Sequence, residues 1–300
     1  MSTDCAARRL EADEVKRLGA SAEAIGAHYD VGDAFFALWL DRTLTYTCAT
    51  WADASGLEAA QTAKIDDLAR RALVTAGARV LDVGCGWGGL LRRLVETHGV
   101  RQAVGLTLSP AQTSFARQHP LPGVEVRQEH WVDHAPVEPY DAIVSVEAFE
   151  AFARNGLSSD EKIAVYREFF RRCHEWLAPG GRLSLQLIAY GNSGPEDLDA
   201  FISGEIFPES DLPRLCEVTA ACERLFEVVE LRNDRADYGL TLKAWLANLT
   251  ARRAEAAQLV GSEVVERFVR YLRLSRYMFE AGTCDLFRIA LRRIDRPRRP

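Results

Sequence analysis

The segment from Val80 to Gly89 reads Val-Leu-Asp-Val-Gly-Cys-Gly-Trp-Gly-Gly and constrains the fold more than any other part of the sequence. It predicts a buried strand that runs into a glycine-rich turn and then into a helix over 90–95. Gly84, Gly86 and Gly88 would let the backbone approach a bound ligand closely, since a Cβ there would obstruct it. Such a turn also occurs where a strand packs tightly against a helix, so the surrounding sequence has to decide.

The second predicted strand, over 102–107, argues against a nicotinamide cofactor. In dinucleotide-binding enzymes an acidic residue about 20 positions further on usually holds the ribose. Here the strand ends in Leu108-Ser109-Pro110, without a carboxylate. The sequence therefore favours a different ligand for the glycine turn.

Strands and helices alternate after the turn, which is the pattern of a parallel sheet covered by helices. Strands are predicted over 79–83, 102–107, 124–128, 141–146, 182–188, 226–231 and 286–292. Helices are predicted over 8–25 (as one helix or two), 32–40, 56–73, 160–177, 240–253 and 262–280. The predicted fold class is α/β, a Rossmann-like, doubly wound, seven-stranded and mostly parallel sheet with a helical cap. The ligand of such a sheet lies at the carboxyl ends of its strands.

No internal repeat, low-complexity tract or linker divides the sequence, so residues 1–300 are expected to form one domain. Its expected parts are an N-terminal helical cap (1–75), a cofactor-binding core (76–188), a lid or substrate segment (189–223) and C-terminal strands and helices (224–300).

Charge and cysteine usage narrow the function. The formal net charge is −6 and the pI is about 5.6, which argues against a nucleic-acid partner. No apolar run reaches the ~20 residues that cross a bilayer, and the N-terminus lacks the apolar core of a signal peptide, so a cytoplasmic protein is expected. The seven cysteines are scattered and no histidine pair has ligand spacing, which predicts reduced thiols and no metal site. The basic segment 292–300 is either a solvated tail or a docking element for an acidic carrier protein or lipid headgroup.

Dispersed motifs accompany the glycine turn. They are His28-Tyr-Asp-Val with Phe35-Phe-Ala-Leu, Leu44-Thr-Tyr-Thr-Cys-Ala49, Gly105-Leu-Thr-Leu-Ser-Pro-Ala-Gln112, Ser145-Val-Glu-Ala-Phe-Glu150, Glu205-Ile-Phe-Pro208 and Asp237-Tyr238. In this order, over roughly residues 25–293, they resemble the cyclopropane fatty acid synthase and mycolic acid methyltransferase family. The Asp-x-Gly-x-Gly form of the turn resembles motif I of class I S-adenosylmethionine (SAM) methyltransferases, to which that family belongs.

The resemblance implies SAM as the cofactor. Its contacts would fall on Tyr46, Thr47, Asp82, Gly84, Gly86, Thr107, Leu108, Gln112, Trp131 and Val146. Gln112 would hold the ribose hydroxyls, which accounts for the missing carboxylate after the second strand. Trp131 would offer an aromatic face to the adenine or to the cationic sulfonium.

The resemblance also implies a catalytic set that holds a bicarbonate ion as the base. The set maps to Glu150, Tyr238, the Cys48 backbone and Gln186, where the family has a histidine. Ala151 is a second departure, because a histidine usually follows the glutamate. Gln186 can still donate an amide N–H to an anion. These departures leave open whether the product closes to a cyclopropane or keeps a methyl branch.

The resulting hypothesis is a SAM-dependent C-methyltransferase that acts on a carbon–carbon double bond of an acyl, polyketide or terpenoid chain. Attack of the double bond on the methyl group forms a carbocation, which then loses a proton in a dry pocket. The alternatives are an N-methyltransferase of a small amine and a SAM-binding cyclase of a secondary-metabolite pathway. The expected partner is a hydrophobic small molecule or lipid, with at most peripheral membrane contact. A carrier protein and a homo-oligomer remain open.

Overall fold

The computed structural model describes residues 9–29 and 31–296, without the side chains of 27–29. The side chain of His28, the thiol of Cys5 and residues 297–300 of the basic tail therefore lie outside the described residues. Within the described part, no helix is long and apolar enough to cross a membrane.

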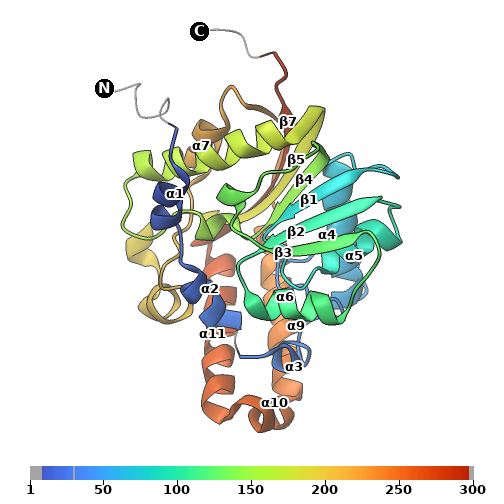
Figure 1. The fold of residues 1–300 in the computed structure, drawn as a ribbon. Coiled ribbons are helices and arrows are strands. Elements are labelled where there is room, and N and C mark those ends of the chain that lie inside the picture. The colour runs from blue at the N-terminus through green and yellow to red at the C-terminus, as the bar shows by residue number, and fades with distance from the viewer. Residues whose placement is uncertain (1–8, 30, 297–300) are drawn as a thin grey trace.

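A seven-stranded sheet in the order β3-β2-β1-β4-β5-β7-β6 forms the centre of the molecule (Figure 1). The strands are β1 (Arg79–Val83), β2 (Gln102–Thr107), β3 (Val124–Gln128), β4 (Tyr140–Val146), β5 (Leu177–Tyr190), β6 (Phe226–Asn233) and β7 (Cys284–Arg293). Strands β1 to β5 pair in parallel, whereas β7 runs antiparallel to both β5 and β6. This arrangement confirms the predicted doubly wound α/β fold.

Alternate side chains of the central strands enter two separate cores, as the period of two residues in a strand requires. Leu81 and Val83 pack on one face with α7 (Ser159–Trp176) and α8 (Leu215–Cys222). Val80 packs on the other face with α4 (Leu57–Arg71) and α5 (Gly89–Glu96). The remaining helices near the sheet are α1 (Ala12–Leu18), α2 (Ala22–Tyr29), α6 (Pro110–Gln118), η2 (Trp131–Asp133) and η3 (Phe149–Ala151).

A helical cap extends beyond the sheet at the lower end of Figure 1. It comprises α3 (Asp33–Phe36), η4 (Pro195–Asp197), η5 (Ile202–Ile206), α9 (Arg235–Ala251), α10 (Arg253–Val260) and α11 (Ser262–Ala281). Its core is aromatic: the Phe35 ring lies 4.9 Å from that of Phe268, and Trp39 lies 5.8 Å from Trp245. Such contacts hold helices from both ends of the chain together.

Several predicted element boundaries differ from the structure, and the helix predicted over 32–40 is confined to Asp33–Phe36. Strand β5 begins at Leu177 rather than at residue 182, because Pro179 and two glycines cannot extend α7 and the chain pairs with β4 through a bulge instead. The helix predicted over 240–253 begins at Arg235, and a non-helical Arg252 separates it from α10.

Candidate active site

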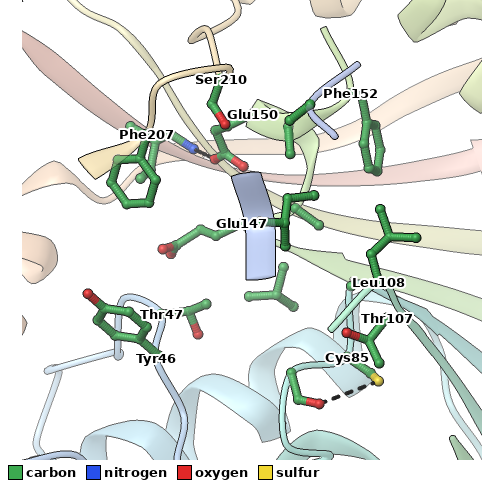
Figure 2. Close-up of a pocket in the computed structure, with 18 of the residues that line it drawn as sticks. Tyr46, Thr47, Cys85, Thr107, Leu108, Glu147, Glu150, Phe152, Phe207 and Ser210 are labelled. Atoms are coloured by element: carbon green, nitrogen blue, oxygen red, sulfur yellow. Dashed lines mark hydrogen bonds between the residues drawn. The ribbon is translucent and has the colours of Figure 1, made fainter. Parts of the chain in front are cut away.

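One pocket lies between the carboxyl ends of the central strands and the cap (Figure 2). All ten predicted cofactor residues line it, namely Tyr46, Thr47, Asp82, Gly84, Gly86, Thr107, Leu108, Gln112, Trp131 and Val146. The cap contributes residues of segment 198–212 and of α9 and α11. The pocket therefore joins the predicted cofactor site to a second region beneath the cap.

The glycine turn is shaped by its backbone conformation. The N–H groups of Gly84 and Cys85 both donate to the Leu106 carbonyl, at 3.0 and 2.9 Å, which folds the turn over the end of β2. Gly84 has φ +87°, and a Cβ placed on it would lie 2.3 Å from the Cβ of Ala148. A side chain at this position would therefore displace the backbone that lines the pocket.

Replacing Gly84 with alanine is expected to weaken binding of S-adenosylhomocysteine (SAH) by at least ~10-fold, measured by calorimetry. Gly77→Ala is the matched control, because Gly77 also has a positive φ (+78°) but no atom lies within 4 Å of its added Cβ. The control should lose about 1 kcal/mol of folding free energy and bind SAH normally. Equal SAH affinity in the two variants would contradict this account of the turn.

Two buried groups of opposite charge also line the pocket. Lys64 of α4 donates to the Thr47 hydroxyl at 2.7 Å, and burial lowers the pKa of its amine to about 8. Burial raises the pKa of Asp82 to about 7, with Lys64 opposing the shift. The Oδ1 atom of Asp82 is buried without a hydrogen-bond partner among the described residues. A ligand with an ammonium and a carboxylate, as in an amino acid, complements this pair.

The Gln112 side chain is fixed at the pocket wall by its neighbours. The Thr107 hydroxyl donates to Gln112 Oε1 at 2.6 Å, while Ser109 caps α6 by accepting the N–H of Gln112 at 3.3 Å. This local geometry holds a polar amide at the end of β2, where an acidic residue is absent.

The strongest concentration of hydrogen bonds in the pocket falls on Glu147, directly after β4. Its Oε1 accepts from the Cys48 N–H at 2.9 Å and from the Gln186 amide at 2.7 Å, and its Oε2 accepts from the Tyr238 hydroxyl at 2.6 Å. Burial raises the pKa of Glu147, whereas these three donors oppose the shift. They stabilise the ionised form of a carboxyl that is removed from water.

Tyr238 of α9 acts only as a hydrogen-bond donor to Glu147. Burial, followed by the charge of Glu147, raises the pKa of its hydroxyl well above the usual value, so the proton stays on the oxygen. Its ring stacks on Phe279 of α11 at 4.2 Å, which fixes the hydroxyl in place.

Arg288 of β7 decides which way the Gln186 amide faces. Its guanidinium donates to Gln186 Oε1 at 2.8 Å and to the Ala49 carbonyl at 3.0 Å. Because arginine can only donate, the amide nitrogen must face Glu147. Arg288 is fully buried and is paired with Asp234.

Glu150 lies in the same pocket but is bonded differently. Its Oε1 accepts the N–H of Ile188, and its Oε2 is buried without a hydrogen-bond partner among the described residues. Burial, with the charge of Glu147 as the second cause, raises the pKa of Glu150 to about 8. This carboxyl is therefore mostly protonated at neutral pH.

The predicted catalytic set is thus rearranged. Cys48, Gln186 and Tyr238 come together as the resemblance implies, but the anion that they hold is the carboxylate of Glu147. Glu150 makes none of these bonds and takes a backbone N–H instead. The three groups that the resemblance assigns to bicarbonate therefore donate to a carboxyl group of the protein in this structure, and the role of bicarbonate stays a prediction.

The sequence analysis did not identify Glu147 or Lys64 as site residues, although the position of each in the sequence indicates such a role. Glu147 immediately follows a predicted strand, at the sheet edge where ligands bind. Lys64 falls on the buried stripe of α4, at the spacing of Ala60 and Leu68, where a lysine has no packing reason to be.

Comparison with known proteins places these observations in a family. The model of the mycolic acid cyclopropane synthetase family matches residues 16–289. The S-adenosylmethionine-dependent methyltransferase UmaA of Mycobacterium tuberculosis is 32% identical over 282 residues, covering 88% of this chain and 94% of the relative. Hydroxymycolate synthase MmaA4 of the same species is 35% identical over 283 residues, with coverages of 88% and 90%.

Solved structures agree with this assignment. Mycolic acid cyclopropane synthase CmaA1, complexed with SAH and CTAB, superposes with a TM-score of 0.82 at 34% identity, covering 92% of this chain and 100% of the other. Coclaurine N-methyltransferase (TM-score 0.75, 20% identity) and the [4+2]-cyclase SpnF (0.70, 17%) share the fold alone. The pocket, its glycine turn and the family match agree: the chain belongs to the mycolic acid cyclopropane synthetase family and is a SAM-dependent methyltransferase.

Proposed function

We propose that this enzyme transfers a methyl group to a carbon–carbon double bond of a hydrophobic substrate and that Glu147 is its base. The observation that carries the proposal is the Glu147 carboxyl group, which accepts hydrogen bonds from three donors at the wall of the pocket. The three donors orient it and exclude other partners. A base fixed beside a reacting carbon needs this kind of support.

The substrate end of the pocket supports an apolar acceptor. Segment 198–212 contributes Leu198, Ile202 and Phe207, and the cap helices contribute Leu242 and Phe279. Such walls exclude water from a carbocation and attract its charge through aromatic faces. The names of the relatives, among them cyclopropane and hydroxymycolate synthases, and the lipid-like CTAB bound to CmaA1 are consistent with a lipid chain.

The residues that hold the cofactor follow from the site. The glycine turn lets the backbone approach it, Gln112 meets the ribose, and the Lys64–Asp82 pair receives the carboxylate and ammonium of the amino-acid part. SAM supplies an electrophilic methyl group on a sulfonium centre.

Glu147 performs the second half of the reaction. When the π electrons of the double bond have formed the new C–C bond, the adjacent carbon carries the positive charge. The Glu147 carboxylate accepts a proton, and the electrons of the broken C–H bond quench the charge. Loss from the new methyl group closes a cyclopropane, because these electrons form a bond between the methyl carbon and the cationic carbon. Loss from a chain carbon next to the cation forms a double bond and leaves a methyl branch. A methylene branch requires a hydride to shift first from the methylated carbon to the cation, so that the proton is then lost from the methyl group next to the charge. No bicarbonate ion is needed, because the protein supplies the carboxylate.

Deuterium labelling tests this function. The enzyme is incubated with SAM that carries a trideuterated methyl group and with panels of cis-unsaturated acyl lipids, isoprenoid alcohols and small amines, and the products are analysed by mass spectrometry. A C-methylated product with two or three deuteriums is expected, and the number identifies the carbon that loses its proton. Labelling of amines alone, or SAM binding without formation of SAH on any panel, would contradict the proposal.

A further inference from the structure

The second carboxyl of the pocket, Glu150, is not needed as the base of the proposed reaction. Its Oε2 atom is buried and has no partner among the described residues, and its side chain lines the pocket. Figure 2 shows this carboxyl pointing into the pocket from the end that holds Ser210 and Phe207, away from Thr107 and Leu108 at the cofactor end. The unpartnered oxygen therefore faces the substrate region.

Hydrogen bonding fixes which oxygen carries the proton. Glu150 Oε1 accepts the N–H of Ile188, so in the protonated acid Oε1 is the carbonyl oxygen and Oε2 carries the hydrogen. Burial raises the pKa of both carboxyls, but three donors stabilise the ionised form of Glu147, whereas burial and the charge of Glu147 raise the pKa of Glu150 to about 8. Protonated Glu150 thus adds a buried hydroxyl donor to the end of the pocket that Ile202, Phe207 and Ser210 also line.

We infer that the substrate carries an uncharged oxygen acceptor (a carbonyl, ether or hydroxyl oxygen) near its double bond, and that Glu150 Oε2–H donates to it. Leaving a buried donor without an acceptor costs free energy and lowers affinity by ~10-fold. A plain hydrocarbon segment would leave this cost in the complex, whereas an oxygen placed there removes it. Glu150 is therefore a specificity residue for an oxygenated chain. The inference rests on the proposed function for its substrate class.

The surroundings of Glu150 define its titration. Glu147 faces it from the end of β4 and Tyr166 from α7. The N–H of Asp211 donates to the Glu150 carbonyl at 3.3 Å, but the Asp211 carboxylate is itself paired with Lys162 at 2.9 Å. Since the pKa of Glu150 is raised to about 8, the donor is present below this pH and is lost above it.

A matched pair of probes tests the inference without turnover. The ketone 2-nonanone and its methylene isostere 2-methyl-1-nonene each displace a fluorescent fatty-acid probe from the SAH-bound enzyme. Each measured affinity is corrected for the free energy of transfer of the ligand from water to hexadecane. The wild type should prefer the ketone by ~10-fold. Glu150→Gln should keep the preference, because its carbonyl takes the Ile188 N–H and its NH₂ faces the pocket. Glu150→Leu should lose it.

A pH series provides a second test that does not depend on the folding of Glu150→Leu. The preference of the wild type should fall as pH rises through about 8, while that of Glu150→Gln stays constant. No ketone preference in the wild type, or a preference that survives in Glu150→Leu or at pH 10, would overturn the inference. These experiments measure binding alone, so a negative result would not contradict the proposed methyl transfer. Conversely, the binding results can be interpreted even if the labelling experiment fails.

Discussion

Glutamine at position 147 is expected to lower turnover by a factor of ~100 or more, the usual contribution of a positioned base, while SAH affinity stays near that of the wild type. The amide has the shape of the carboxylate but no useful basicity. Its single carbonyl oxygen can replace only one of the two carboxylate oxygens, so its NH₂ must face either the Cys48 N–H or the Tyr238 hydroxyl. Single-turnover rates and calorimetric SAH binding measure the two effects separately.

Tyr238→Phe is the matched comparison for this variant. It removes one of the three donors to Glu147 and keeps the ring that stacks on Phe279. Its turnover should fall less than that of Glu147→Gln, because the carboxylate remains and keeps two donors. A Glu147→Gln enzyme with turnover within a few-fold of the wild type would remove Glu147 from the role of base.

Loss of Arg288 should produce the largest change in stability. Arg288→Met is expected to lower the free energy of unfolding by roughly 3–5 kcal/mol, because it leaves Gln186 Oε1 and the Ala49 carbonyl without their buried donor and removes one of the two arginines paired with Asp234. Denaturant unfolding monitored by tryptophan fluorescence measures the change.

Arg292→Met is the control on the same strand. Arg292 pairs with Glu227, and both side chains are 52% exposed, so its loss should cost at most about 1 kcal/mol. Similar losses of stability in the two variants would show that Arg288 is not an essential buried donor.

Much of the sheet could be predicted because its strands follow a simple local pattern. The predicted bounds of β1, β2 and β3 coincide with the observed ones, since β1 and β2 are mostly apolar and β3 begins with alternating apolar and polar residues. The start of β5 could not be predicted, because it depends on the pairing of Leu177 with Tyr140, which lies far earlier in the chain. Local sequence does not record such a partner.

The cofactor end of the site was predictable and the catalytic end only in part. The glycine turn and the end of β2 are local motifs, so each residue named there lines the pocket. The catalytic end is assembled from loops, strand ends and α9, which are distant in the sequence. The donors that the resemblance assigns to an anion beside Glu150 bond to Glu147 instead. Glu147 also adopts a positive φ of +50°, an unusual conformation for a non-glycine residue that only the structure reveals.

Removal of bicarbonate distinguishes Glu147 as the base from an external bicarbonate ion. Glu147→Gly should fold, because glycine adopts a φ of +50° readily, and it leaves the Cys48 N–H, the Gln186 amide and the Tyr238 hydroxyl free for a small anion. Methyl-transfer rates are compared in buffer depleted of carbon dioxide and in the same buffer with added bicarbonate. The wild-type rate should be the same in both buffers, and bicarbonate should restore the Glu147→Gly rate in part. A wild-type rate that falls without bicarbonate would show that Glu147 does not replace the external base.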